Sequence, residues 1–181
     1  MLGRNPVVIA VAILTVFSGC GSDPIAPEGR KRVFVTSASF TGDLGGLAGG
    51  DAKCSSAAAA AALGGTFRAW LSDATTDAVD RITHPGPWFL VDTTSRVFNS
   101  KAELAAQPMV PIIVTETGAA ISFGATVWTG TESDGTASTV TCTNWSSTSG
   151  TGRIGQVSTN AWTSAASNSC TTPSRLYCFE L

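Results

Sequence analysis

The sequence predicts a single loop-rich domain that combines short strands with one or two helices. Charged residues make up 13% of the 181 residues and glycine occurs 19 times, a composition typical of turn-rich folds rather than helical bundles. About 150 residues follow the N-terminal region, which is enough for one domain with its own hydrophobic core. Four cysteines are spread through this part of the chain, as in exported domains that are closed by disulfides; they are Cys54, Cys142, Cys170 and Cys178.

The N-terminal region has the layout of a secretory leader. Arg4 precedes an apolar run at residues 7–17, and small residues follow up to Cys20. This order of a positive charge, an apolar stretch and small residues is that of a signal peptide. The apolar run is too short to cross a bilayer as a helix, which takes about 20 residues. We therefore predict that residues 1–19 are a signal peptide that is removed.

The last residues of this leader, Phe17-Ser18-Gly19-Cys20, resemble the lipobox of bacterial lipoproteins, in which the cysteine becomes the acylated first residue. We expect Cys20 to be lipidated and residues 20–31, which mix Gly, Ser, Pro and charge, to form a flexible tether. Because Gly21 rather than Asp follows Cys20, an outer-membrane or cell-surface location is favoured. The alternative is a simple secretory leader in which Cys20 is incidental.

The domain at residues 32–181 should begin with a strand at 32–37 and end with a strand at 175–181, because both runs are rich in apolar and aromatic residues. A helix is predicted over 51–63. Asp51 suits the N-terminal end of the helix dipole, six consecutive alanines favour helix, and two glycines end it. Further strands are predicted at 66–72, 89–91, 96–98, 112–115 and 126–129, the 89–91 and 96–98 segments pairing with each other, and a short helix is predicted at 73–82.

Residues 130–168 form a long polar stretch with little periodic signal. Loops of this length in a compact domain are usually functional or disordered, and the cysteines within and beside the stretch favour an ordered loop. Trp70 and Trp128 lie in apolar strand contexts and are expected in the core, which leaves Trp145 and Trp162 as the better candidates for exposed contacts. Glu132 and Asp134 precede Gly135 and are interpreted as part of an Asp-Gly turn. The stretch contains our weak candidates for a binding surface. The candidates are Glu132, Asp134, Asn144, Trp145 and Trp162.

The order of these signals resembles the endostatin-like branch of the C-type-lectin-like fold, and most closely the bacterial, leptospiral-type endostatin-like lipoproteins. The resemblance is carried collinearly by four segments at residues 50–54, 63–72, 127–145 and 169–180. It implies an α+β fold with an antiparallel sheet, one or two helices and a long loop region, and it places the N- and C-terminal strands side by side.

The resemblance also implies a disulfide pattern. Four cysteines allow three pairings, and the sequence alone does not rank them. In the endostatin-like pattern the two disulfides are nested, with Cys54–Cys178 outside and Cys142–Cys170 inside.

Several departures from the wider superfamily limit what the resemblance implies. The calcium-binding tripeptides of sugar-binding lectins are absent, and Asn144-Trp145-Ser146 lacks the carboxylate of their Trp-Asn-Asp strand, so we expect no lectin-type calcium site. Only Arg68 remains of the arginine patch of animal endostatins, so heparin binding is doubtful. The zinc site of those proteins uses histidines, and this chain has only His84.

Other chemistry has little support. Residues 150–155 satisfy a GxGxxG pattern, but no helix is predicted to follow, so a solvated loop is the better interpretation. His84 lies in a proline-rich turn, and the sequence has no Gly-x-Ser-x-Gly elbow. Asp73, Asp77 and Asp80 are spaced to share one face of the short helix and are interpreted as a solvated face. We therefore expect neither a cofactor nor catalytic activity.

The function predicted from these features is a lipid-anchored binding module of the cell envelope. Bacterial endostatin-like lipoproteins are associated with attachment to extracellular-matrix and plasma proteins, and the resemblance implies the same partners here, through the loops at 130–168. With residues 1–19 removed, ten Lys and Arg stand against thirteen Asp and Glu, so nucleic acid is not an expected partner. The alternative is a structural or accessory envelope domain without a host ligand; a lectin or an enzyme ranks lower.

Overall fold

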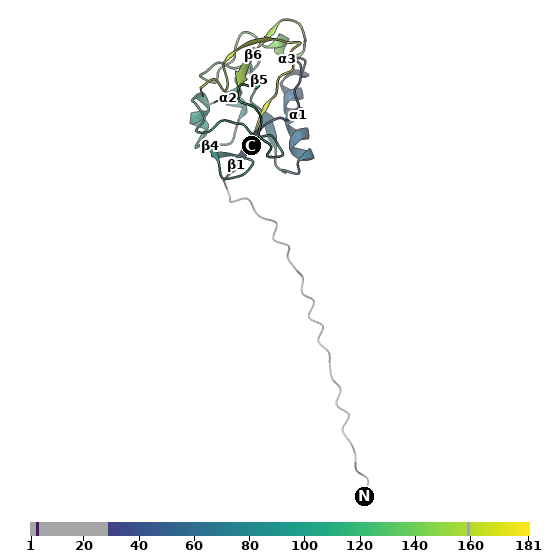
Figure 1. Cartoon of the computed structure of the whole chain (residues 1–181), viewed down its shortest axis with the longest axis vertical. Helices are drawn as coiled ribbons and strands as arrows, with labels where there is room; N and C mark the ends of the chain where they lie inside the picture. Colours follow the sequence, from purple (N-terminus) through teal and green to yellow (C-terminus); the bar gives the residue numbers. More distant parts are fainter. Residues whose placement is uncertain (1–2, 4–28, 159) are drawn as a thin grey trace.

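The structure of the protein is a computed structural model that describes residue 3, residues 29–158 and residues 160–181 (Figure 1). The predicted signal peptide (residues 1–19), the lipidation at Cys20 and most of the predicted tether lie outside the described residues, apart from Gly3. The described chain folds as an α+β domain with two sheets, few helices and two disulfides. In Figure 1, α1 (Gly46–Ala60) lies along the right-hand side, and strands β5 (Thr126–Trp128) and β6 (Thr151–Gln156) lie at the top.

The larger sheet has five strands in the order β2-β8-β1-β3-β4. Strands β1 and β8 pair antiparallel, with Val33 opposite Phe179, which confirms that the first and last strands are neighbours. Strands β3 and β4 form the predicted antiparallel pair. The bounds of the strands are β1 Lys31–Val35, β2 Phe67–Ala69, β3 Trp88–Leu90, β4 Arg96–Phe98 and β8 Tyr177–Glu180.

The prediction of an antiparallel sheet is wrong for one pair of strands, because β1 and β3 are parallel, with Val33 opposite Leu90. Parallel neighbours need a long crossover connection. Here the chain supplies one, since it passes through α1, β2 and α2 between β1 and β3. The sheet is therefore mixed.

The second sheet has three antiparallel strands in the order β5-β6-β7. Strand β5 (Thr126–Trp128) was predicted, whereas β6 (Thr151–Gln156) and β7 (Ala166–Ser169) lie in the stretch predicted to be loop. The glycines of β6 and the small polar residues of β7 give no alternating apolar signal. Their strand conformation is fixed by pairing with each other and with β5, so only part of the stretch at 130–168 is loop.

Helix α1 (Gly46–Ala60) begins five residues before the predicted start. Asp51 is therefore inside the helix instead of at its N-terminal end. The buried face of α1 consists of Gly50, Cys54 and Ala58, one residue in each turn. A Cβ atom on Gly50 would lie 3.0 Å from Cδ2 of Leu71, so the glycine allows the helix to approach the segment at β2 closely.

The remaining helical elements are short: α2 (Ala78–Arg81), a 3-10 helix η1 (Lys101–Ala105) and α3 (Cys142–Trp145). The helix predicted at 73–82 is confined to α2, because Asp73 instead accepts a hydrogen bond from the backbone N–H of Thr75 in a turn. Asp73, Asp77 and Asp80 therefore do not share a helix face. The segment predicted as a strand at 112–115 makes only an isolated bridge, Val114 to Ala120.

Both disulfides have the predicted nested pairing. Cys54–Cys178 joins α1 to β8, with the Cα atoms 5.5 Å apart, and Cys142–Cys170 joins α3 to the residue after β7, with the Cα atoms 5.7 Å apart. All four cysteines are buried, in the same apolar cluster as Phe34, Trp128 and Trp145. The bridges therefore tie α1 to β8, an interior strand of the larger sheet, and hold the region of α3 against β7.

All five tryptophans are buried. This confirms the core positions expected for Trp70 and Trp128. Trp145 and Trp162, the candidates for exposed contacts, are buried as well, with exposed fractions of 0% and 2%. Each indole N–H has an acceptor inside the fold: Trp145 Nε1 donates to the Ser72 carbonyl (2.7 Å) and Trp162 Nε1 to the Ala106 carbonyl (2.9 Å). A buried tryptophan usually has such a hydrogen-bond acceptor. The polar residues beside Trp145 and Trp162 in the sequence gave no sign that each indole would find its acceptor inside the core.

Candidate ligand-binding site

The acidic candidates lie on a tight turn after β5. An isolated bridge between Thr131 and Ala137 closes this turn, and Glu132 N–H donates to the Thr136 carbonyl at 2.8 Å. Gly135 at its tip has a φ of +89°, a conformation that glycine adopts without strain. The Asp-Gly turn is therefore as the sequence predicts.

Asp134 and Trp162 line a surface depression of about 320 Å³. Three separate segments form it: the end of η1, the turn after β5 and the connection between β6 and β7. The other lining residues are Ala105, Ala106, Gln107, Ser133, Asn160, Thr163 and Ser164. Apart from Ser133, which is next to Asp134, nothing in the sequence singled out these residues, because the fold brings them together from distant positions.

The other two predicted candidates do not line this depression. Asn144 is exposed on α3, where its side-chain oxygen accepts from the Ala74 backbone N–H at 3.0 Å. Trp145 packs against Trp128 in the core, with ring centroids 5.6 Å apart. The structure thus groups Asp134 with Trp162 and leaves Asn144 and Trp145 elsewhere.

Hydrogen bonds to the core hold the floor of the depression. The Trp162 indole joins the connection after β6 to the residue after η1, through the Ala106 carbonyl. Thr163 Oγ1 accepts from Trp70 Nε1 at 2.7 Å, and the Thr163 carbonyl accepts from Thr129 Oγ1 at 2.6 Å. The floor is therefore part of the rigid core rather than a free loop.

Glu132 lies beside the depression, and both of its carboxylate oxygens accept hydrogen bonds from other residues of the domain. Arg153 Nη2 donates to its Oε1 at 2.8 Å, and Ser164 Oγ donates to its Oε2 at 3.1 Å. Partial burial alone would raise the pKa of Glu132, but hydrogen bonds from Ser138 and Arg153 and the charge of Arg153 lower the pKa overall. Glu132 and Arg153 together are close to electrically neutral.

Asp134 carries the exposed negative charge of the site. Its Oδ1 accepts from Thr136 N–H (3.1 Å) and from Thr136 Oγ1 (2.6 Å). These hydrogen bonds lower the pKa of Asp134, so the carboxylate is ionised at neutral pH. Among the described residues, no basic side chain forms an ion pair with it.

The stability of the domain is expected to fall in acid. The pKa values of five carboxyls are lowered by hydrogen bonds from nearby backbone or side-chain groups, although burial opposes the shift at all five. Burial is the largest single contribution at Asp73, Asp92 and Glu132, where several hydrogen bonds together outweigh it, and hydrogen bonds are the largest contribution at Glu103 and Asp134.

A lowered pKa in the native state means that the unfolded chain binds more protons just below the ordinary values of 3.8 for Asp and 4.5 for Glu. The stabilisation is present above these values and is lost as the pH falls through the native ones. Urea unfolding between about pH 3 and pH 8 measures this. The lowered pKa of His84 acts in the same direction, because the unfolded chain binds its proton near the ordinary value of 6.5. We therefore expect a free energy of unfolding that is constant above about pH 7.5 and declines below it; a constant or rising value in acid would contradict the assignment.

The other groups that the sequence singled out do not line this depression. In residues 29–158 and 160–181, no group of three or more His, Cys, Asp and Glu side chains is arranged to hold a metal ion. His84 Nδ1 accepts from Gly86 N–H at 3.0 Å; burial, together with the charge of Lys31, lowers the pKa of His84. The GxGxxG segment, predicted as a loop, instead forms most of β6. No helix of the described residues is both long and apolar enough to span a membrane.

These features define a disulfide-closed α+β domain that displays a surface depression with apolar and polar walls beside its smaller sheet. The chain belongs to the family described as Protein of unknown function (DUF1554), whose model matches residues 37–163. The matched region contains the turn with Asp134 and the segment up to Thr163 that lines the depression. No curated protein matches the chain.

Proposed function

We propose that this protein is an exported, lipid-anchored binding domain of a bacterial cell envelope, and that it contacts a protein ligand without catalysing a reaction. The observation that carries the proposal is the depression itself. It joins Asp134, a candidate binding residue from the sequence, to a rigid floor on a scaffold that two nested disulfides close. Rigid scaffolds commonly present binding residues on their loops.

Several features support a location of the protein outside the cytoplasm. Disulfides persist in oxidising locations outside the cytoplasm, and all four cysteines of the domain are paired. The leader and the lipobox-like segment ending at Cys20 point the same way, and they favour attachment to the outer membrane or the cell surface.

The partner class rests on the resemblance to the endostatin-like branch of the C-type-lectin-like fold, which favours extracellular-matrix or plasma proteins. The surface gives no support to heparin or nucleic acid as ligands. Arg68, the one arginine retained from the endostatin patch, lies 3.6 Å from the Asp51 carboxylate and donates to the Arg81 carbonyl at 2.6 Å. It is therefore engaged within the fold.

Binding of the mature lipoprotein in detergent to immobilised fibronectin, laminin, plasma proteins and glycans tests the proposal. We expect at least one protein of the panel to bind, and Asp134→Asn to weaken that binding about tenfold, since a hydrogen bond to a charged group contributes roughly 1.5–3 kcal/mol. Intact-mass measurement of the same sample reports acylation at Cys20 and both disulfides.

Asp92→Asn is the matched control. Asp92 is also exposed and also accepts from the backbone two residues later, at 2.8 Å from Thr94 N–H, but it lies between β3 and β4. Asparagine removes the charge and keeps the Oδ1 acceptor of both turns, although at Asp92 it also removes the Oδ2 acceptor of Ser95 Oγ, which donates at 2.6 Å. Protein reduced at both disulfides should lose binding. The absence of any ligand across the panel would refute the proposal in favour of the structural alternative.

A further inference from the structure

We propose that the depression accepts a cationic side chain of the protein ligand, an alkylammonium or alkylguanidinium group, with Asp134 as its counter-charge. This inference rests on the proposed function, because it assigns the ligand chemistry of the same site. The group would be a lysine or an arginine, and the experiment below distinguishes them.

The walls of the depression suit an aliphatic stem that ends in a polar head. Ala105, Ala106 and Trp162 supply apolar surface, whereas hydroxyl and amide groups surround them. Lysine and arginine bury their methylene groups against apolar surface and keep the charged head near polar groups. A depression of about 320 Å³ is at the lower end of the range of ligand sites, roughly 300–1,000 Å³, which fits one side chain better than a large cofactor.

The charge of the lining selects a cation. Asp134 is the one ionisable residue among the lining residues, and its carboxylate faces no basic side chain there. Glu132 beside it is already balanced by Arg153 at 2.8 Å. An ionised carboxylate offers about four acceptor positions, and the two hydrogen bonds from Thr136 both fall on Oδ1. Asp134 therefore retains acceptor capacity for an N–H donor, while an anion would be repelled.

A sugar ring fits the depression less well. Aromatic recognition of a sugar uses an exposed ring face, and Trp162 is 2% exposed and packs against Trp70 with ring centroids 4.9 Å apart. A neutral polyol would also leave the charge of Asp134 without a counter-charge.

Chemical-shift titration of the ¹⁵N-labelled mature protein in detergent tests the inference. The probes are the N-acetyl N-methylamides of lysine and arginine, each with an uncharged partner of similar shape, norleucine and citrulline. We expect the cationic probes to shift the amides of Asp134 and Ser164 and the indole N–H of Trp162, with the stronger binder identifying the head group. Asp134→Asn should weaken binding about tenfold, and Asp92→Asn should leave it unchanged.

The spectrum of each variant shows that the fold is intact before any titration. Equal shifts from the uncharged probes would overturn the inference, and so would unchanged binding by Asp134→Asn. If the protein panel binds but neither cationic probe does, the inference fails and the proposed function stands. If the cationic probes bind at Asp134 but no protein of the panel does, the inference stands and the assigned partner class fails.

Discussion

Replacing Cys54 and Cys178 together with alanine is expected to lower the free energy of unfolding by about 5 kcal/mol. The bridge joins residues 124 positions apart, and a crosslink that closes a longer loop removes more conformational entropy from the unfolded chain. It connects α1 to β8 in the middle of the larger sheet. Urea unfolding followed by tryptophan fluorescence measures the loss, since all five indoles are buried in the native state.

The double replacement of Cys142 and Cys170 is the matched control. That bridge spans 28 positions, and the same relation gives a loss of about 3.6 kcal/mol. Both pairs are fully or almost fully buried, so the losses from packing should be similar. The outer bridge should therefore contribute about 1 kcal/mol more than the inner one. A larger loss for the inner pair would show that loop entropy does not set the order.

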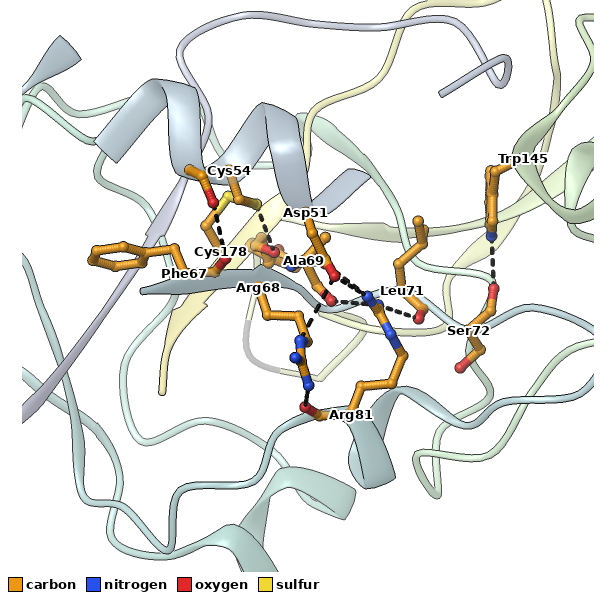
Figure 2. Close-up of polar contacts among 12 residues, drawn as sticks. Asp51, Cys54, Phe67, Arg68, Ala69, Leu71, Ser72, Arg81, Trp145 and Cys178 are labelled. Carbon is orange, nitrogen blue, oxygen red and sulfur yellow. Dashed lines mark hydrogen bonds and ion pairs between the residues drawn. A yellow bond between two sulfur atoms is a disulfide. The ribbon is translucent and has the colours of Figure 1, made fainter. Parts of the chain in front are cut away.

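Arg81→Met is the second change with a large expected effect. Arg81 is 8% exposed, and its Nη2 donates to both Asp51 carboxylate oxygens at 2.6 and 2.7 Å, while Nη1 donates to the Ala69 and Leu71 carbonyls at 2.8 Å each (Figure 2). Methionine would leave the carboxylate and both carbonyls without this donor. Removing one partner of a buried ion pair costs about 3–5 kcal/mol, and urea unfolding should show a loss in this range.

Arg68→Met provides the comparison at the same carboxylate. The Arg68 side chain is 34% exposed and its Nε lies 3.6 Å from Asp51, so this pair is longer and more exposed than the pair with Arg81. Exposed ion pairs contribute about 0–1 kcal/mol, and we expect a loss in that range. Similar losses for the two variants would mean that the burial of Arg81 is not what makes its contacts important.

For Asp51, the sequence predicted the nearby helix but not the contacts of its side chain. Its place before six alanines predicted the start of a helix, yet α1 starts at Gly46, and the carboxylate instead accepts from Ala69 N–H at 2.9 Å and from Arg81. The helix itself follows from local preference. The role of Asp51 depends on a residue 30 positions away, and no local pattern encodes that pairing.

The candidate binding residues show the same difference between what local patterns predict and what long-range contacts decide. The turn around Asp134 was predicted because Asp-Gly favours it locally, and Trp162 was chosen for its polar neighbours. The structure places both at one depression, but it buries the Trp162 ring and adds Ala105, Ala106 and Gln107 from another segment. Small or polar residues of this kind occur on every surface, so their sequence carries no signal that they meet.

The sequence by itself determined the features that depend on neighbouring residues: the alanine-rich helix, the β3–β4 pair, the Asp-Gly turn, and four cysteines whose nested pairing the resemblance supplied. Only the tertiary structure decided the parallel pairing of β1 with β3, the strands β6 and β7, the burial of Trp145 and Trp162, and the depression at Asp134. The physical reason is that these features arise from contacts between residues far apart in the chain, whose free energies no local pattern records.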